Sequence, residues 1–349
     1  MSDINIRIEG KAGRITLNRP AALNALTWDM CLKIEAALDD WRDDDAVALV
    51  IIDAVGEKAF CAGGDLVELY HESRAGNLNY GRNFWADEYR LNAKISEYPK
   101  PYIAFMQGFT MGGGVGASCH GSHRIVGDTS RIAMPECSIG LIPDVGGTFL
   151  LARAPGHVGE YLAVTGFRMQ AADAIYATFA DTYIPEEKWG NVMSTLAETG
   201  NAACLPDCAA PPPGGLLAER EPWIARHFRG ASLGDVVRSL EADNDDLAKE
   251  TLKAIGRQSP LSAAAAYEAV RRVRGSASIH RALEMEYRFT WRSIEDSDFL
   301  EGIRALIIDK DKSPAWHHDG PKDVTTAEVA RMLMPLGKHG LSLDGPGNS

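Results

Sequence analysis

The sequence predicts an α/β protein with a mainly parallel sheet, followed by a helical region. Two continuous apolar runs of strand length, residues 47–52 and 102–106, are typical of strands that are buried on both faces. Helical spacing of apolar residues recurs between such runs, as in a layered α/β architecture. Beyond about residue 185 the strand signals fade and helices follow one another. A length of 349 residues allows one large domain or two smaller ones.

The first elements follow this alternation. Residues 14–17 predict a short strand that ends at Asn18-Arg19-Pro20. Thr27 can cap a helix, because the apolar residues after it have 3-4-3 spacing: Cys31, Ile34, Leu38 and Trp41. The strand at 47–52 comes next, and a helix starts at Leu66 after a glycine-rich turn.

The middle of the chain repeats the pattern. A helix is expected over 84–95, then the strand at 102–106, a turn and a glycine-rich helix start. Short strands are expected at 124–126 and 131–134. Because strands and helices alternate, the strands are expected to be parallel.

The second half predicts helices near 245–256, 261–273, 279–293 and 297–309, and Ser232 with Asp235 forms a capping-box-like start to another. Residues 202–219 are rich in Pro, Ala and Gly, which favours a mobile connection. The predicted organisation is therefore a core over 1–200, a linker over 201–220, a helical region over 221–335 and a frayed tail over 336–349.

Composition and charge argue against several classes of partner. The chain is 45% hydrophobic and 24% charged, and its net charge of −12 argues against a nucleic-acid partner. No apolar run reaches the ~18 residues of a membrane span, so no membrane partner is expected. The start of the chain shows no apolar or Arg/Ser-rich leader, and six cysteines are too few for a disulfide scaffold. A cytoplasmic location is expected.

Three glycine-rich segments carry the chemical signal. Residues 60–65 and 108–116 each lie between a strand and a helix, where glycines let backbone N–H groups approach a ligand. A helix N-terminus also suits a developing oxyanion. The third segment, 134–147, places Glu136 and Asp144 eight residues apart on one loop.

Taken singly, each segment has a simpler explanation. Glycines after a strand usually form only a turn, Glu136 can cap a helix, and Asp144 can form a turn. A dinucleotide-binding fingerprint is rejected, because Cys119 stands where its third glycine is required. Only the order and spacing of all three segments are specific.

That order resembles the crotonase (enoyl-CoA hydratase/isomerase) superfamily, together with residues 15–20 and Asn24-Ala25. The resemblance implies a spiral of ββα turns followed by a helical C-terminal region, and an acyl-CoA substrate. It also implies an oxyanion hole formed by the N–H groups of Gly64 and Gly113. By the same resemblance, the residues beside CoA are Asn24, Ala25, Ala62 and Gly63.

Two departures indicate a branch of the superfamily. Gly116 stands where hydratases have a first glutamate, and Asp144 stands where they typically have glycine. The segment 143–147 resembles 3-hydroxyisobutyryl-CoA hydrolases, and the likeness covers about residues 4–317. It implies Glu136 as catalytic base or nucleophile, Asp144 as its partner, and Glu88 in substrate binding. For Glu88, a solvated helix face is an equally good interpretation.

The expected activity is hydrolysis of 3-hydroxyisobutyryl-CoA, a step of valine and so of branched-chain amino acid degradation. An enoyl-CoA hydratase or isomerase is the alternative, and a CoA-binding module without turnover is a third. No metal and no cofactor beyond the CoA of the substrate are expected. The acyl group stays open, because one methyl group is worth only about 1–3 kcal/mol. Assembly stays open too, as a monomer, a trimer or a multiple of a trimer.

Overall fold

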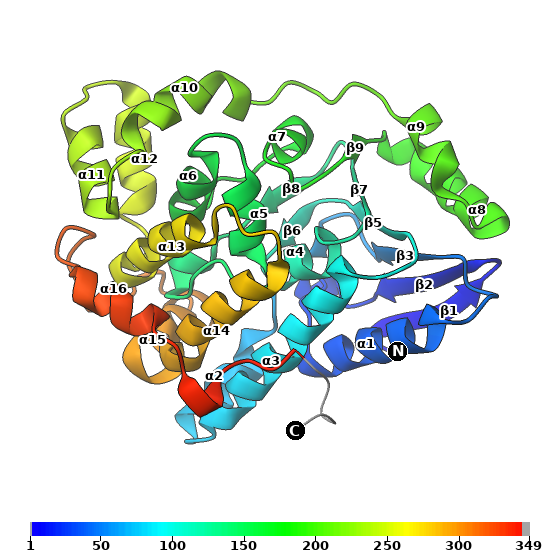
Figure 1. Cartoon of the computed structure of the whole chain (residues 1–349), viewed down its shortest axis with the longest axis horizontal. Helices are drawn as coiled ribbons and strands as arrows, with labels where there is room; N and C mark the ends of the chain where they lie inside the picture. The colour runs from blue at the N-terminus through cyan, green and yellow to red at the C-terminus, as the bar shows by residue number, and fades with distance from the viewer. Residues whose placement is uncertain (1, 344–349) are drawn as a thin grey trace. The chain divides into compact units, whose positions relative to one another are not determined.

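A computed structural model describes residues 2–343 (Figure 1). By its contacts, the chain divides into two compact units. The first unit comprises residues up to 64, 90–133 and 168–218. The second comprises 65–89, 134–167 and 219 onward. Each unit therefore collects three separate stretches of sequence, so the units do not follow the boundaries predicted near residue 200.

The first unit contains the strands. They are β1 (Ile4–Glu9), β2 (Ala12–Leu17), β3 (Leu49–Ala54), β4 (Ala59–Cys61), β5 (Tyr102–Met106), β6 (Phe109–Met111), β7 (His123–Val126), β8 (Arg131–Ala133) and β9 (Thr182–Tyr183). Its helices and 3-10 turns are η1 (Pro20–Ala22), α1 (Trp28–Arg42), α4 (Gly113–Ser118), α7 (Ala171–Tyr176), η3 (Glu186–Lys188), α8 (Trp189–Thr199), η4 (Ala202–Cys204) and α9 (Leu205–Cys208). Thr27 caps α1 by accepting from the N–H of Met30, as predicted.

Two sheets organise these strands. One has the order β1-β2-β3-β5-β7-β9 and the other β4-β6-β8. All pairs are parallel except β1 with β2. Consecutive strands from β3 to β9 therefore alternate between the sheets, and each pair advances both sheets by one position. This is a spiral of ββα turns, which confirms the predicted fold class.

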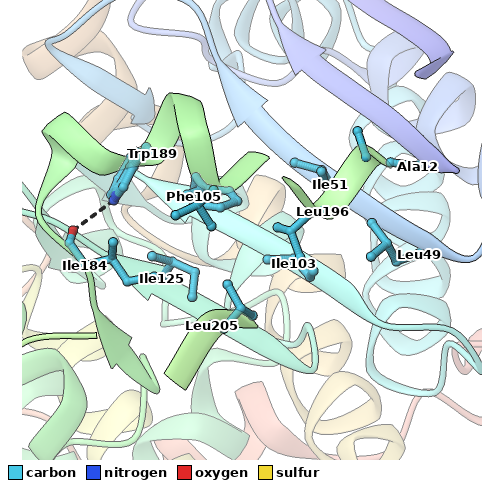
Figure 2. Packing of buried hydrophobic residues seen from close by; sticks show 12 residues of the cluster. Ala12, Leu49, Ile51, Ile103, Phe105, Ile125, Ile184, Trp189, Leu196 and Leu205 are labelled. Carbon is cyan, nitrogen blue, oxygen red and sulfur yellow. Dashed lines mark hydrogen bonds between the residues drawn. The ribbon is translucent and has the colours of Figure 1, made fainter. Parts of the chain in front are cut away.

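Apolar side chains hold α8 and α9 against the larger sheet (Figure 2). Ile51, Ile103 and Phe105 from neighbouring parallel strands meet Trp189 and Leu196 of α8. The rings of Trp189 and Phe105 pack edge to face, with their centroids 5.3 Å apart. The indole N–H of Trp189 donates to the carbonyl oxygen of Ile184 at 2.8 Å. The continuous apolar runs in the sequence thus become strands that are buried on both faces.

The second unit is helical. It contains α2 (Leu66–Arg74), η2 (Glu136–Ile139), α5 (Gly147–Arg153), α6 (Val158–Thr165), α11 (Leu233–Glu241), α12 (Asp246–Ile255), α13 (Pro260–Val273), α14 (Ile279–Asp296), α15 (Phe299–Ile303), the π-helical turn η5 (Arg304–Ile308), α16 (Thr326–Leu333) and η6 (Gly337–His339). Two helices, α3 (Leu78–Ser96) and α10 (Leu217–His227), contribute residues to both units. In the second unit, α13 packs against α5, α6 and α16, while α14 packs against α5 and α16.

Some local predictions differ from the structure. The sequence analysis missed β1, although Ile4, Ile6 and Ile8 alternate with polar residues. Part of the predicted linker is helical: it contains α9, whose Leu205 is buried and so anchors this helix. Residues 209–215 of the linker have no regular secondary structure. The predicted tail contains η6, and its residues 344–349 lie outside the described part of the chain. No helix among the described residues is long and apolar enough to cross a membrane.

Candidate active site

Two of the glycine-rich turns lie side by side in the first unit. Cys61 ends β4 and Gly113 begins α4 just after β6, and β4 and β6 are neighbouring parallel strands. The carboxyl ends of parallel strands lie at the same sheet edge, so the two turns meet there. Their approach is close, because a Cβ on Gly114 would lie 2.3 Å from the carbonyl oxygen of Cys61. Only glycine fits at this position.

This edge offers backbone donors. Gly113 is the first residue of α4, and the preceding Gly112 has a φ of 49°, in the left-handed region. Among residues 2–343, the N–H groups of Gly64 and Gly113 donate to no protein acceptor. Unpaired N–H groups beside a helix N-terminus can stabilise an oxyanion, so the predicted donors stay available for that role.

The turn at residues 19–26 lies against the first glycine-rich turn. The N–H of Ala62 donates to the carbonyl of Leu23 at 3.0 Å, and that of Leu26 donates to Gly63 at 2.9 Å. The structure thus brings Asn24 and Ala25 next to Ala62 and Gly63, as the predicted CoA-binding set requires.

Asn24 itself has a structural task. Its side-chain amide accepts from the N–H of Arg19 at 2.8 Å and donates to Val55 and Ala59 at 3.0 and 2.9 Å. A cavity of about 430 Å³ opens beside it, and Lys58 is among its lining residues. Asn24 therefore shapes this cavity, whereas its role in CoA binding stays a prediction.

Four carboxyl groups are buried together in the second unit. Glu88 comes from α3, Glu136 from η2, Asp144 from the loop before α5, and Glu286 from α14. Their exposed fractions are 4%, 5%, 5% and 0%, in the same order. Electrostatic coupling joins Asp144 to Glu88 and Glu136, and also to Glu286, so the loop residue is the centre of the cluster.

Hydrogen bonds divide the four into two kinds. The hydroxyl of Tyr89 donates to Oδ2 of Asp144 at 2.8 Å. Glu286 accepts from the N–H groups of Gly146 and Thr148 and from the Thr148 hydroxyl. By contrast, Oε1 of Glu88 and Oε2 of Glu136 are buried and have no partner within the described residues. Because buried polar atoms are almost always paired, these two oxygens are suited to a ligand or water.

Burial dominates the electrostatics of the cluster. It raises the pKa of Glu88 and of Glu136 well above the ordinary value, and the charge of Asp144 raises both further. Burial also raises the pKa of Asp144 to about 7, against the opposing hydrogen bond from Tyr89. For Glu286, burial raises the pKa, whereas the hydrogen bonds from Thr148 and Gly146 lower it. Three donors point at its two oxygens, which fits the ionised carboxylate. Glu88, Glu136 and Asp144 therefore retain protons near neutral pH and can both accept and donate them.

The sequence analysis found three of these four acids. Its alternative for Glu88, a solvated helix face, is wrong, because that side chain is buried. It assigned no role in the site to Glu286 or Tyr89. The available signal for Glu286 was a glutamate in the apolar stripe of its helix, between Leu283 and Phe289. A buried charge in such a stripe is costly and usually has a specific partner.

A group of side chains outside the carboxyl cluster has spacing suitable for a metal ion. Among the described residues, only His227, Asp243 and Asp245 form such a cluster. Nη2 of Arg226 lies 2.5 Å from Oδ2 of Asp243 and 3.6 Å from Oδ2 of Asp245. The guanidinium group of Arg226 therefore already supplies a positive charge to these carboxylates.

The fold and these residues define a class of protein. A family model described as "Enoyl-CoA hydratase/isomerase" matches residues 12–333, and the chain belongs to this family. This confirms the crotonase resemblance.

Particular relatives narrow the class. The chain is 37% identical to "3-hydroxyisobutyryl-CoA hydrolase, mitochondrial" of Xenopus tropicalis, a match that covers 96% of this chain and 89% of that protein. This confirms the resemblance to the hydrolase branch.

Two solved structures are also similar. A structure titled as an enoyl-CoA hydratase from Rhodobacter sphaeroides 2.4.1 has 52% identity and a TM-score of 0.93, and covers 98% of this chain and 100% of that one. A structure titled as a carnitinyl-CoA dehydratase from Mycobacterium thermoresistibile has 40% identity and a TM-score of 0.94, with coverages of 99% and 100%. The names of the relatives thus disagree on the reaction.

Proposed function

We propose that this chain hydrolyses a short 3-hydroxyacyl-CoA thioester, with 3-hydroxyisobutyryl-CoA as the favoured substrate and 3-hydroxyisobutyrate and CoA as products. The names of the curated relatives support a hydrolase. The observation that carries the proposal is the unpartnered Oε2 of Glu136, buried beside an Asp144 that a tyrosine holds in place. Such a pair can activate one water molecule.

In the first route, Glu136 acts as a general base. It takes a proton from water while the hydroxide adds to the thioester carbonyl, and the C–S bond then breaks. The CoA thiolate leaves and takes a proton from the carboxyl pair. Retained protons near neutral pH make this donation feasible, and proton transfer of this kind typically contributes about 10²–10⁴-fold to the rate.

In the second route, Glu136 is the nucleophile. Its oxygen adds to the carbonyl carbon, CoA leaves as the thiolate, and the resulting mixed anhydride is opened by water. Turnover in ¹⁸O-labelled water distinguishes the routes when water attacks the glutamyl carbon, because the label then enters the Glu136 carboxylate. The first route places label only in the product.

Two further roles complete the proposal. Gly64 and Gly113 supply N–H groups to the carbonyl oxygen as it gains charge; loss of one such donor costs roughly 3–4 kcal/mol in comparable sites. The unpartnered Oε1 of Glu88 accepts a hydrogen bond from the 3-hydroxyl group of the acyl chain. A hydroxyl that pairs with a buried carboxylate favours hydroxyacyl over simple acyl substrates.

Hydration of an enoyl-CoA is the second candidate. The 52% identity to a structure with a hydratase title favours it. Gly116 argues against it, because it stands where the similar hydratases have the first of two glutamates, and glycine supplies neither an acid nor a base. Asp144 also argues against it, because it stands where those hydratases typically have glycine.

A parallel assay decides between the candidates. The protein is incubated with 3-hydroxyisobutyryl-CoA, 3-hydroxypropionyl-CoA, isobutyryl-CoA and crotonyl-CoA, while free thiol and enoyl absorbance are followed. Release of thiol from the hydroxyacyl substrates supports the proposal. Loss of enoyl absorbance without thiol release establishes a hydratase. Binding without either change leaves a CoA-binding module.

The setting of the reaction belongs to the same proposal. We place it in valine degradation, with no cofactor besides the CoA of the substrate, and in the cytoplasm. The support for a reducing location is the cysteine usage of the sequence, since six cysteines in 349 residues are too few for a disulfide scaffold. Sedimentation of the purified protein tests whether it is a monomer, a trimer or a larger multiple.

A further inference from the structure

The loop that carries Asp144 has a strained backbone. Val145 has a φ of 52° and Gly146 a φ of 77°, so two consecutive residues after Asp144 are left-handed. A β-branched side chain disfavours this region strongly, and such a residue persists only where surrounding contacts enforce it. The loop therefore requires an external constraint.

Glu286 supplies three contacts to this loop. Its Oε2 accepts from the N–H of Gly146 at 2.7 Å, and its Oε1 accepts from the N–H and the hydroxyl of Thr148 at 2.9 and 2.5 Å. Thr148 lies in the first turn of α5, where N–H groups have no partner within the helix. One carboxylate from a helix 138 residues away thus fixes both the left-handed residue and the start of α5.

A comparison with Glu160 shows what is unusual. Glu160 is also fully buried in the second unit, but it pairs with Arg274 at 2.7 Å and His157 at 3.1 Å. No cation pairs with Glu286 among the described residues, and all its hydrogen bonds go to the Asp144 loop and the start of α5. A buried acid without a cation is expensive, so its position suggests a purpose beyond packing.

We infer that Glu286 is a positioning residue, which holds the strained 144–148 segment and thereby sets where the Asp144 carboxylate lies. This inference rests on the proposed hydrolase function. Tyr89 holds the Asp144 carboxylate itself, because its hydroxyl donates a hydrogen bond to Oδ2 of Asp144. Glutamine cannot replace Glu286, because its NH₂ group would face an N–H or hydroxyl donor at one of the two oxygen positions.

The test uses Glu286→Gln with Glu160→Gln as a matched control. We expect Glu286→Gln to lower kcat for thiol release about 10- to 100-fold with KM within about twofold. We expect Glu160→Gln to lower the melting temperature while kcat per folded molecule stays near the wild-type value. Hydrogen exchange should speed up at the amides of Gly146 and Thr148 in the first variant only.

A double-mutant cycle separates positioning from general stability. If Glu286 acts through Asp144, adding Glu286→Gln to Asp144→Asn lowers kcat no further. The inference is overturned if the double variant loses kcat by the product of the two single losses, or if Glu286→Gln alone keeps the wild-type kcat. If Glu286→Gln does not fold, Thr148→Val and Thr148→Ser replace it: Val should lower kcat and Ser should preserve it. A wild-type protein that releases no thiol from any substrate refutes the proposed function instead, and the exchange rates then test the loop contact alone.

Discussion

Replacing Asp144 with asparagine should make the protein more stable and nearly inactive. Asn keeps the shape of the side chain, and its Oδ1 can still accept from the Tyr89 hydroxyl that lies 2.8 Å from Asp144. What it removes is a negative charge buried among three other carboxyl groups. Active sites commonly hold such destabilising groups because the chemistry needs them.

The magnitude follows from the pKa of Asp144, which burial raises from 3.8 to about 7. At 1.36 kcal/mol per pH unit this corresponds to ~4 kcal/mol, so we expect a gain of ~1–4 kcal/mol above pH 7. The sign depends on pH. Below about pH 4 the carboxyl is protonated in folded and unfolded chains alike, and no difference arises. Between pH 4 and 7 only the unfolded chain ionises, so the wild-type protein loses stability as the pH rises.

The measurement is urea unfolding of both proteins at pH 5, 6, 7 and 8, with thiol release measured on the same samples. The difference in unfolding free energy should widen up to about pH 7 and then level off. Asp29→Asn, at an exposed position on α1, is the control and should show no such widening. A constant difference across this range refutes the electrostatic reasoning. Near-wild-type hydrolysis by Asp144→Gly would reduce Asp144 to a turn residue.

Three other outcomes are expected. Glu136→Gln should lower kcat at least ~100-fold while calorimetry shows unchanged CoA binding; normal turnover removes Glu136 from the mechanism. Glu88→Ala should raise KM about 10- to 100-fold for 3-hydroxyisobutyryl-CoA but little for isobutyryl-CoA, and equal effects on both would contradict its contact with the hydroxyl. Gly114→Ala should cost ~1–3 kcal/mol, because its Cβ would lie 2.3 Å from the Cys61 carbonyl. Gly190→Ala on α8, where a Cβ meets nothing within 4 Å, is the matched control for thermal melting.

The local signals in the sequence were strong where a single element decides its own conformation. The apolar run at 102–106 became β5 with the same bounds, and Thr27 caps α1 as its position before an amphipathic stretch indicated. Ser232 and Asp235 form the capping box at α11. These features depend on neighbours in the sequence, so periodicity and capping chemistry were sufficient to predict them.

The family and three of the carboxylates also followed from the sequence, because they lie in motifs with fixed order. Glu88, Glu136 and Asp144 were all singled out, and the structure buries all three. Whether Glu88 faces solvent stayed open, since one helix face cannot reveal what packs against it.

Tertiary structure alone decided how the loop at Asp144 is held. The sequence shows a turn at 143–147, but neither the left-handed Val145 nor its constraint can be read from it. The constraint comes from Glu286, which is 140 residues from Gly146 along the chain. Contacts at such separation depend on packing that no local pattern encodes. The sequence thus determined which acids the site contains, and the fold determined which of them is tied and which keeps a free oxygen for chemistry.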